Sequence, residues 1–87
     1  MKTGGWLNEA AQELEAAGIG TARLDALVLL EDVTGQDRAW TLAHPEHELP
    51  HAQRAKLAKL LRLRAAHTPL AYVRGRTEFY GRNFVIT

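Results

Sequence analysis

The stretch TARLDALVLLEDVTG, residues 21–35, decides the fold of this 87-residue chain. Its first residue, Thr21, is a good helix N-cap, and its last, Gly35, is a typical residue to follow a helix C-terminus. The run between them is apolar on nearly all sides, and exposing that much leucine and valine to water would cost about 1.5 to 3 kcal/mol per side chain. We therefore expect a helix here that is central and packed against several others.

Four further helices are expected around this one. Asp37 can cap a short helix, in which Trp40 is predicted to face the core, and Pro50 and Pro69 suit the first turns of two others. Apolar residues also recur at helical spacing near the start of the chain. The predicted ranges are 4–17, 38–43, 50–66 and, with Thr68 as N-cap and Pro69 as first residue, 69–75. Because all connections are short, the expected fold is an all-α bundle of five helices.

After Gly75 the pattern changes from helical to strand-like. Residues 77–80 and 83–86 are rich in aromatic and β-branched side chains around Gly81-Arg82, which predicts a β-hairpin. The expected organisation is thus a helical domain over residues 1–75 and a hairpin linker over residues 76–87. A lone hairpin is marginal in water and leaves a strand edge open, so we expect this chain to be part of a larger protein.

Composition restricts the classes of function. The chain contains no cysteine, which excludes disulfides and thiolate zinc sites and is consistent with a reducing cytoplasm. No apolar run approaches the roughly 20 residues that cross a bilayer, and the first residues lack the apolar stretch of a signal peptide. A cytoplasmic protein is therefore expected.

The charges are divided unequally along the chain. Residues 1–50 carry three Lys or Arg and nine Asp or Glu, whereas residues 51–87 carry eight and one. This asymmetry predicts a basic side that could meet an acidic partner or a nucleic acid. An equally weighted interpretation is that the two halves attract each other or are simply solvated.

Three histidines, His44, His47 and His51, are close enough in sequence to be candidate zinc ligands. The prolines between them break the helix that would place the imidazoles on one face, so a solvated loop is the favoured interpretation. His67 is interpreted as a residue near a helix C-terminus, where a cation is mildly favoured. Asp25 lies at the start of the apolar helix without an acid–base partner beside it in sequence, so we assign it a structural role near unpaired N–H groups.

Several segments together resemble the HemK/PrmC family, the N5-glutamine methyltransferases of peptide-chain release factors. The resemblance runs in order from about Trp6 to Thr87. It rests on TARLDALVLL (21–30), VTG (33–35), PLAYVRG (69–75) and EFYGRNFV (78–85). It implies a five-helix N-terminal domain, a hairpin, and then a Rossmann-like domain that binds S-adenosylmethionine.

The resemblance also implies that these residues lack the catalytic and cofactor-binding motifs of the family. The family holds the substrate glutamine, in the Gly-Gly-Gln loop of a release factor, with an Asn-Pro-Pro-Tyr motif that this sequence lacks. No phosphate-binding glycine fingerprint is present either. No catalytic or cofactor-binding residue is therefore carried over, and the implied role is recognition of the release factor on behalf of the catalytic domain.

These considerations leave three hypotheses. The first is a release-factor-recognition domain that is not catalytic alone and contacts its partner through Arg54, Lys59, Arg62, Arg74, Arg76, Phe79 and Tyr80. The aromatics Tyr72, Phe79, Tyr80 and Phe84 could form a recognition surface, but aromatics beside a hairpin more often form core. The second is a nucleic-acid-binding bundle that uses Arg54, Lys56, Lys59, Arg62, Arg64, Arg74 and Arg76. The third, a complete enzyme, is disfavoured because no cofactor cradle is evident.

Overall fold

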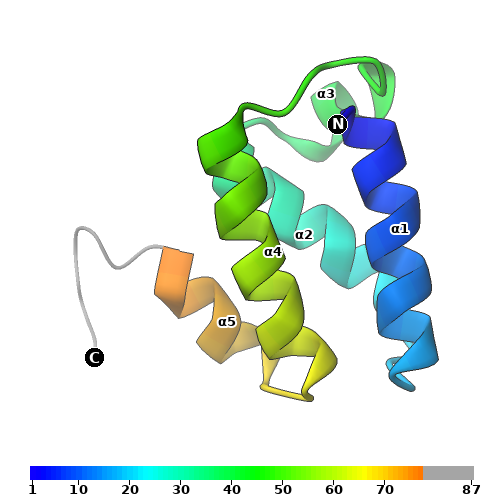
Figure 1. Ribbon diagram of the computed structural model, residues 1–87, viewed down its shortest axis with the longest axis vertical. Coiled ribbons are helices and arrows are strands. Elements are labelled where there is room, and N and C mark those ends of the chain that lie inside the picture. Colours follow the sequence, from blue (N-terminus) through cyan, green and yellow to red (C-terminus); the bar gives the residue numbers. More distant parts are fainter. Residues whose placement is uncertain (78–87) are drawn as a thin grey trace.

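The structure is a computed structural model in which residues 1–77 are described, with side chains to residue 74. Five helices make up the fold (Figure 1). They are α1 (Thr3–Ala16), α2 (Ala22–Thr34), α3 (Arg38–Ala43), α4 (His51–Ala65) and α5 (Leu70–Thr77). The five-helix prediction is confirmed, and the described residues contain no strand beyond an isolated bridge between Lys2 and Glu48. The predicted hairpin lies almost wholly outside the described residues.

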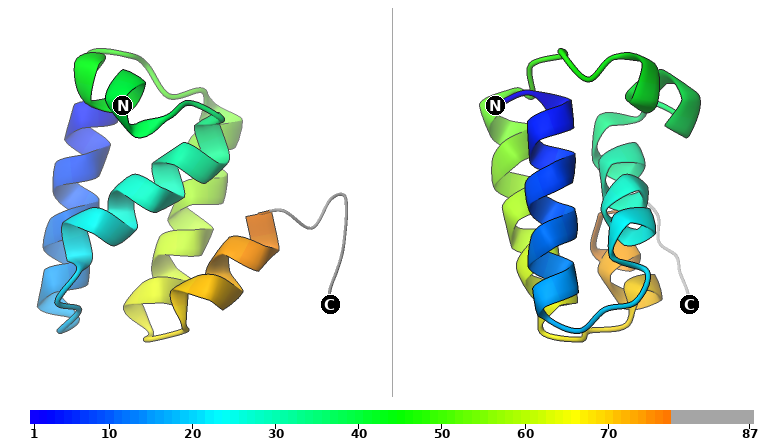
Figure 2. Two further views of the ribbon diagram at one scale, coloured as in Figure 1. Left: turned by 180° about the vertical axis from the view of Figure 1, so that it is seen from behind. Right: turned by 90° about the vertical axis from the view of Figure 1, so that its right-hand side faces the viewer.

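The helices form two layers that are capped at one end. Helices α1 and α4 lie side by side in one layer, α2 and α5 form the other, and α3 with its loops covers the end where the chain begins (Figure 2). Helix α2 contacts all four other helices, as its apolar pattern predicts. Its leucines Leu29 and Leu30 are completely buried, together with Leu14 of α1, Leu57 of α4 and Val73 of α5.

Helices α1 and α4 end in the same way. In each, a left-handed residue reverses the chain, Gly18 with φ 87° after α1 and His67 with φ 68° after α4. The next residue, Ile19 or Thr68, returns its N–H to a carbonyl five residues back, at 3.0 and 3.1 Å. This is the Schellman arrangement, which satisfies carbonyls that a helix end leaves unpaired.

The first turn of α1 is capped by a distant loop instead of by a side chain. Residues 45–49 return past it, and Thr3 and Gly4 donate their N–H groups to the carbonyls of His47 and Pro45, both at 2.9 Å. The approach is so close that a Cβ added to Gly4 would lie 2.9 Å from Cβ of Pro45. Since the first N–H groups of a helix have no partner inside it, this loop replaces an N-cap residue.

Helix α5 and Trp40 differ from the sequence-based expectations. Helix α5 begins one residue later than predicted and runs to Thr77, so Gly75 does not end it and Thr77 does not begin a strand. Trp40 is half-buried and lies outside the core cluster. Its ring stacks on His44 at a centroid distance of 4.3 Å, because α3 has only six residues and lies across the end of the bundle instead of within it.

Candidate partner-binding surface

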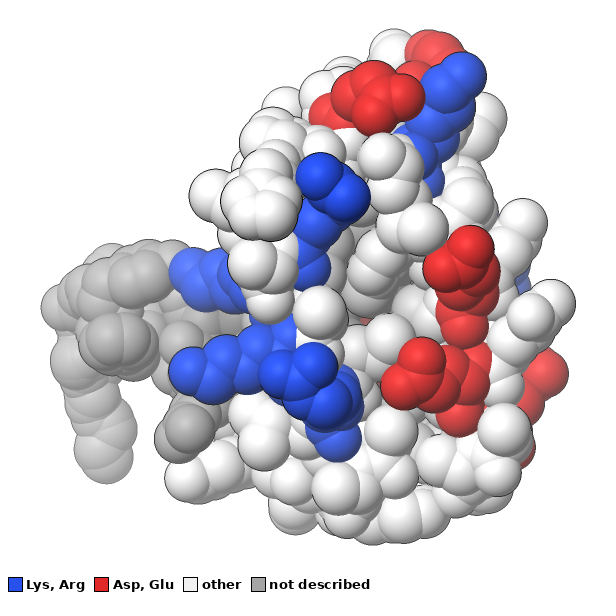
Figure 3. All heavy atoms as spheres, in the orientation of Figure 1, with Lys and Arg blue, Asp and Glu red and all other residues white. Residues whose placement is uncertain are grey.

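The outer face of α4 carries the exposed positive charges that the sequence singled out. Arg54, Lys59 and Arg62 are all exposed there, while Leu57, Leu60 and Leu61 bury the opposite face against the core. Figure 3 shows Lys and Arg side chains gathered over α4, with acidic side chains over α1 on the other side of the same view. The three exposed cations are called the α4 basic face below.

Small side chains lie between the charges of the α4 basic face. Alanines at positions 52, 55 and 58 are exposed on the same side of the helix. Arg54 approaches the ring of His51, with 3.5 Å between its Nη2 and Nδ1 of the histidine. Such a face can attract carboxylates or phosphates through its charge, but its cations are not held in a geometry that selects one particular ligand.

Arg64 does not belong to this face, contrary to its place in the nucleic-acid hypothesis. Its Nε donates to Oδ2 of Asp25 at 2.8 Å, and its Nη1 donates to the carbonyl of Thr68 at 3.0 Å. The Asp25 side chain is 4% exposed and also accepts from the hydroxyl of Thr21 at 3.0 Å. The structural role predicted for Asp25 is therefore supported, but its partner comes from another helix and Thr21 points its hydroxyl at this carboxylate.

Arg74 is likewise engaged within the domain. Its Nε and Nη2 donate to the two carboxylate oxygens of Asp32 on α2, at 2.8 and 3.2 Å. A third pair joins Arg38 of α3 to Glu31 of α2 at 2.8 Å. Helix α2 thus pairs with one arginine from each of α3, α4 and α5. Two of these pairs, Asp25–Arg64 and Asp32–Arg74, join acidic residues of the first half of the chain to basic residues of the second half.

The other predicted partner residues have different outcomes. Lys56 is half-buried on α4 and has contacts of its own. Arg76 lies in α5, but its side chain is not among those described, and Phe79 and Tyr80 lie outside the described residues. The structure therefore assembles Arg54, Lys59 and Arg62 on one face and leaves the contribution of the remaining residues as a prediction.

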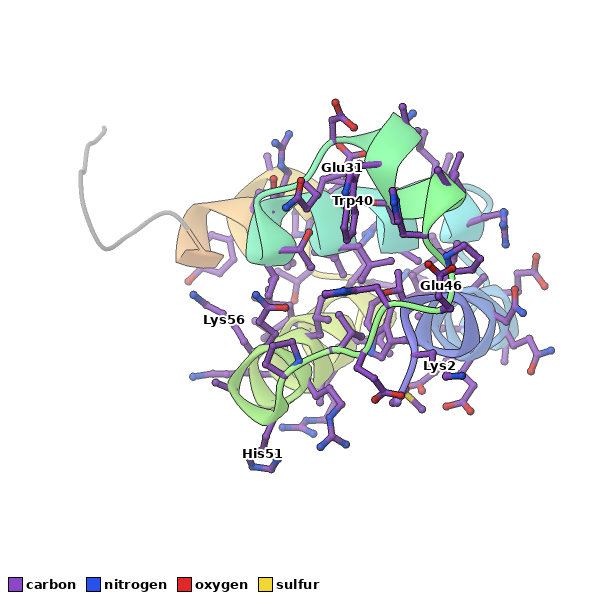
Figure 4. All side chains as sticks on the ribbon, turned by 90° about the horizontal axis from the view of Figure 1, so that it is seen from above. Lys2, Glu31, Trp40, Glu46, His51 and Lys56 are labelled. Atoms are coloured by element: carbon purple, nitrogen blue, oxygen red, sulfur yellow. The ribbon has the colours of Figure 1, made fainter. Side chains whose placement is uncertain are left out.

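The histidine-rich loop is built around Trp40. His44 stacks on its ring and bonds the carbonyl of Trp40 through Nδ1 at 2.8 Å, while His47 meets the ring edge-on at 5.1 Å. His51 points outward from the start of α4, away from Trp40 (Figure 4). Over the described part of the chain, no three His, Asp or Glu side chains gather as a metal ion would require.

A shallow hollow of about 200 Å³ lies between α1, α3 and the start of α2. Its lining is mixed, with Leu7, Leu42 and Pro45 beside Asn8 and Arg23. The other lining residues are Thr3, Gly4 and Thr41, so the lining contains no carboxylate, histidine or lysine. The hollow therefore offers no acid–base pair for catalysis.

None of the helices within residues 1–77 is long and apolar enough to cross a membrane.

The pairing of Asp25 with Arg64 is the feature that sequence reasoning missed. The sequence shows that Asp25 is a carboxylate within an apolar helix, and a buried charge requires a cationic partner. The sequence does not predict that this partner is Arg64 and not Arg62, because both lie in the same basic run of α4.

Comparison with known proteins agrees with the resemblance. Residues 5–75 match the family described as PrmC N-terminal domain. The chain is 37% identical over 73 residues to the release factor glutamine methyltransferase of Clostridium botulinum, covering 84% of this chain and 26% of the relative. It is 40% identical over 75 residues to that of Salmonella typhimurium, covering 86% and 26%.

A bifunctional methyltransferase of Rickettsia bellii is 36% identical over 81 residues, or 93% of this chain and 15% of the relative. The chain thus spans between about a seventh and a quarter of these curated relatives. No solved structure matches significantly. The family match extends from the first turn of α1 to Gly75 in α5 and so includes all or most of every helix described above. The chain therefore belongs to the PrmC N-terminal domain family.

Proposed function

We propose that this domain recognises peptide-chain release factors for an S-adenosylmethionine-dependent methyltransferase that modifies the glutamine of their Gly-Gly-Gln loop. The observation that supports this proposal is the family match over residues 5–75, together with relatives named release factor glutamine methyltransferase. In this proposal the domain itself carries out no chemistry. It supplies binding energy at a distance from the reacting glutamine, and such remote contacts position a substrate for reaction.

The described residues do not fit S-adenosylmethionine. Gly18 and Gly20 lie in the turn between α1 and α2, and Gly35 ends α2, so these glycines serve helix termini. A nucleotide cradle instead follows a strand and opens a helix, and residues 1–77 contain no such unit. The cofactor would therefore be held by a separate catalytic domain of the same protein.

Within this proposal the α4 basic face contacts the release factor. Its exposed cations are available to an acidic partner, whereas Arg64 and Arg74 are held by Asp25 and Asp32. The nucleic-acid alternative loses support for the same reason, because two of its seven named cations are engaged inside the fold. The three cations of the α4 basic face are also fewer than the about 6 to 10 phosphate contacts that make DNA binding strongly salt-dependent.

Titration calorimetry and methylation assays test the proposal. The 87-residue chain should bind a bacterial release factor and show no heat with S-adenosylmethionine, while the full-length protein should methylate the release factor. Saturable binding of S-adenosylmethionine by the chain would overturn the non-catalytic role. Failure of the full-length protein to methylate any release factor would overturn the proposed substrate, and tight salt-dependent RNA or DNA binding would favour the alternative.

A further inference from the structure

The last described helix, α5, is attached to the bundle by one face. Leu70 packs partly buried against the core, Val73 is completely buried, and Arg74 follows it with its bidentate contact to Asp32. Spacings of three and four residues place these side chains together on a helix. Since α5 has only eight residues, it would be marginal as an isolated helix, and its position depends on these contacts.

The contacts of Val73 and of Arg74 contribute in different ways. Burial of Val73 attaches α5 to the core, where α5 contacts α2 and α4. The hydrophobic effect has no preferred direction, however, and permits tilting about the buried side chain. The guanidinium of Arg74 is a rigid planar fork, and two parallel bonds to one carboxylate restrict its orientation. The fork therefore restricts the orientation of α5 relative to α2.

From this geometry we propose that Arg74 and Asp32 are positioning residues, which set the orientation of the recognition domain relative to the catalytic domain that follows α5. The inference rests on the proposed function. A protein that binds one release factor through two domains gains affinity only when their geometry allows both to engage at once. Arg74 thus acts on the reaction through the direction of α5, in place of the direct partner contact predicted for it from the sequence.

The chain contains a matched control on the adjacent residue of α2. Arg38 and Glu31 form a pair of the same length, 2.8 Å, and Arg38 is exposed to nearly the same degree as Arg74, 46% against 48%. That pair joins α2 to α3, at the capped end of the bundle, and has no part in the direction of α5. Arg74→Gln and Arg38→Gln therefore remove equivalent charges, and only the first releases α5.

The experiment compares two substrates of the full-length methyltransferase. One is an intact release factor, and the other is a short Gly-Gly-Gln peptide that only the catalytic domain can hold. Arg74→Gln and Asp32→Asn should each lower kcat/KM for the release factor by about tenfold or more, chiefly through KM, and leave the peptide reaction unchanged. Arg38→Gln should change neither, and Arg74→Lys, which keeps the charge without the fork, should recover only part of the loss.

Different outcomes separate this inference from the proposed function. If Arg74→Gln methylates the release factor as well as Arg38→Gln does, the positioning role is wrong while the proposed function stands. Equal losses on the peptide and the release factor would also overturn it, since they would report damage to the catalytic domain. If the wild-type protein methylates no release factor, the proposed function itself fails. Amide hydrogen exchange on the 87-residue chain gives a check without activity, because Arg74→Gln should speed exchange in α5 alone.

Discussion

The guanidinium of Arg64 donates to the buried carboxylate of Asp25 across 2.8 Å and thereby joins α4 to α2 in the interior of the domain. The same guanidinium donates to the carbonyl of Thr68, just beyond the end of α4. One arginine side chain therefore satisfies a buried charge and connects the core to the turn that leads into α5.

Replacement of Arg64 by methionine should destabilise the domain strongly. The Asp25 carboxylate would remain buried without its cation, and we expect the free energy of unfolding to fall by about 3 kcal/mol, as measured by urea denaturation. The double variant Asp25→Leu with Arg64→Met should regain most of this loss. Arg62→Met, on the exposed face, is the control and should change stability by less than about 0.5 kcal/mol. A similarly small effect of Arg64→Met would contradict a structural role for the pair.

Two neighbouring glycines in α1 should respond in opposite ways to alanine. A Cβ at Gly4 would lie 2.9 Å from Cβ of Pro45, whereas a Cβ at Gly5 would meet nothing within 4 Å. Alanine at position 5 should stabilise the helix by about 0.5 to 1 kcal/mol through its better propensity. Alanine at position 4 has the same propensity gain but displaces the capping loop, with an overpacking penalty of about 1 to 3 kcal/mol. Thermal unfolding should therefore rank Gly5→Ala above wild type and Gly4→Ala below it, and the reverse order would refute the close approach.

His67 combines an unfavourable backbone conformation with a bond to another helix. Its φ of 68° favours glycine, while its Nε2 lies 2.7 Å from the carbonyl of Ala17 at the end of α1. Alanine loses the bond and keeps the strain, so His67→Ala should cost about 1 kcal/mol of stability. His67→Gly loses the same bond but relieves about 1 kcal/mol of strain, and it should be close to wild type. Equal stability of the two variants would argue against the left-handed conformation at this position.

Neutralisation of the α4 basic face should affect binding without affecting the fold. The triple variant Arg54→Gln, Lys59→Gln and Arg62→Gln removes three exposed charges, and its unfolding free energy should change by less than about 1 kcal/mol. Its affinity for the release factor should fall at least tenfold, and the salt dependence of binding should become weaker. A control variant replaces Lys2 and Arg23, two exposed cations outside α4, with glutamine. If both variants bind alike, the partner does not meet the α4 basic face.

The secondary structure was largely predictable because its signals are local. Asp37 begins α3 as predicted, and its carboxylate accepts the N–H of Trp40 at 2.8 Å. Gly35 ends α2 with a left-handed φ of 77°. The end of α5 was predicted two residues too early because glycine, which often ends a helix, is tolerated within one when tertiary contacts hold the helix in place.

The candidate surface was predictable only in part. The basic run of α4 marked Arg54, Lys59 and Arg62 correctly as cations on a helix, but the same reasoning included Arg64 and Arg74. Arg62 and Arg64 are two residues apart, and their angular separation on the helix places one in water and the other toward α2. Trp40 was instead assigned wrongly to the core. Its large apolar ring predicted burial there, but the ring packs against His44 and His47.

The sequence by itself determined where the helices lie, which of them is central, and the family to which the chain is similar, because caps, periodicity and motifs act over a few neighbouring residues. Only the tertiary structure decided which charges serve the interior. Asp25 and Arg64 are 39 residues apart, and Asp32 and Arg74 are 42 apart. Such pairs depend on how α2 crosses α4 and α5, and that crossing is set by the packing of leucines and Val73 across the whole core.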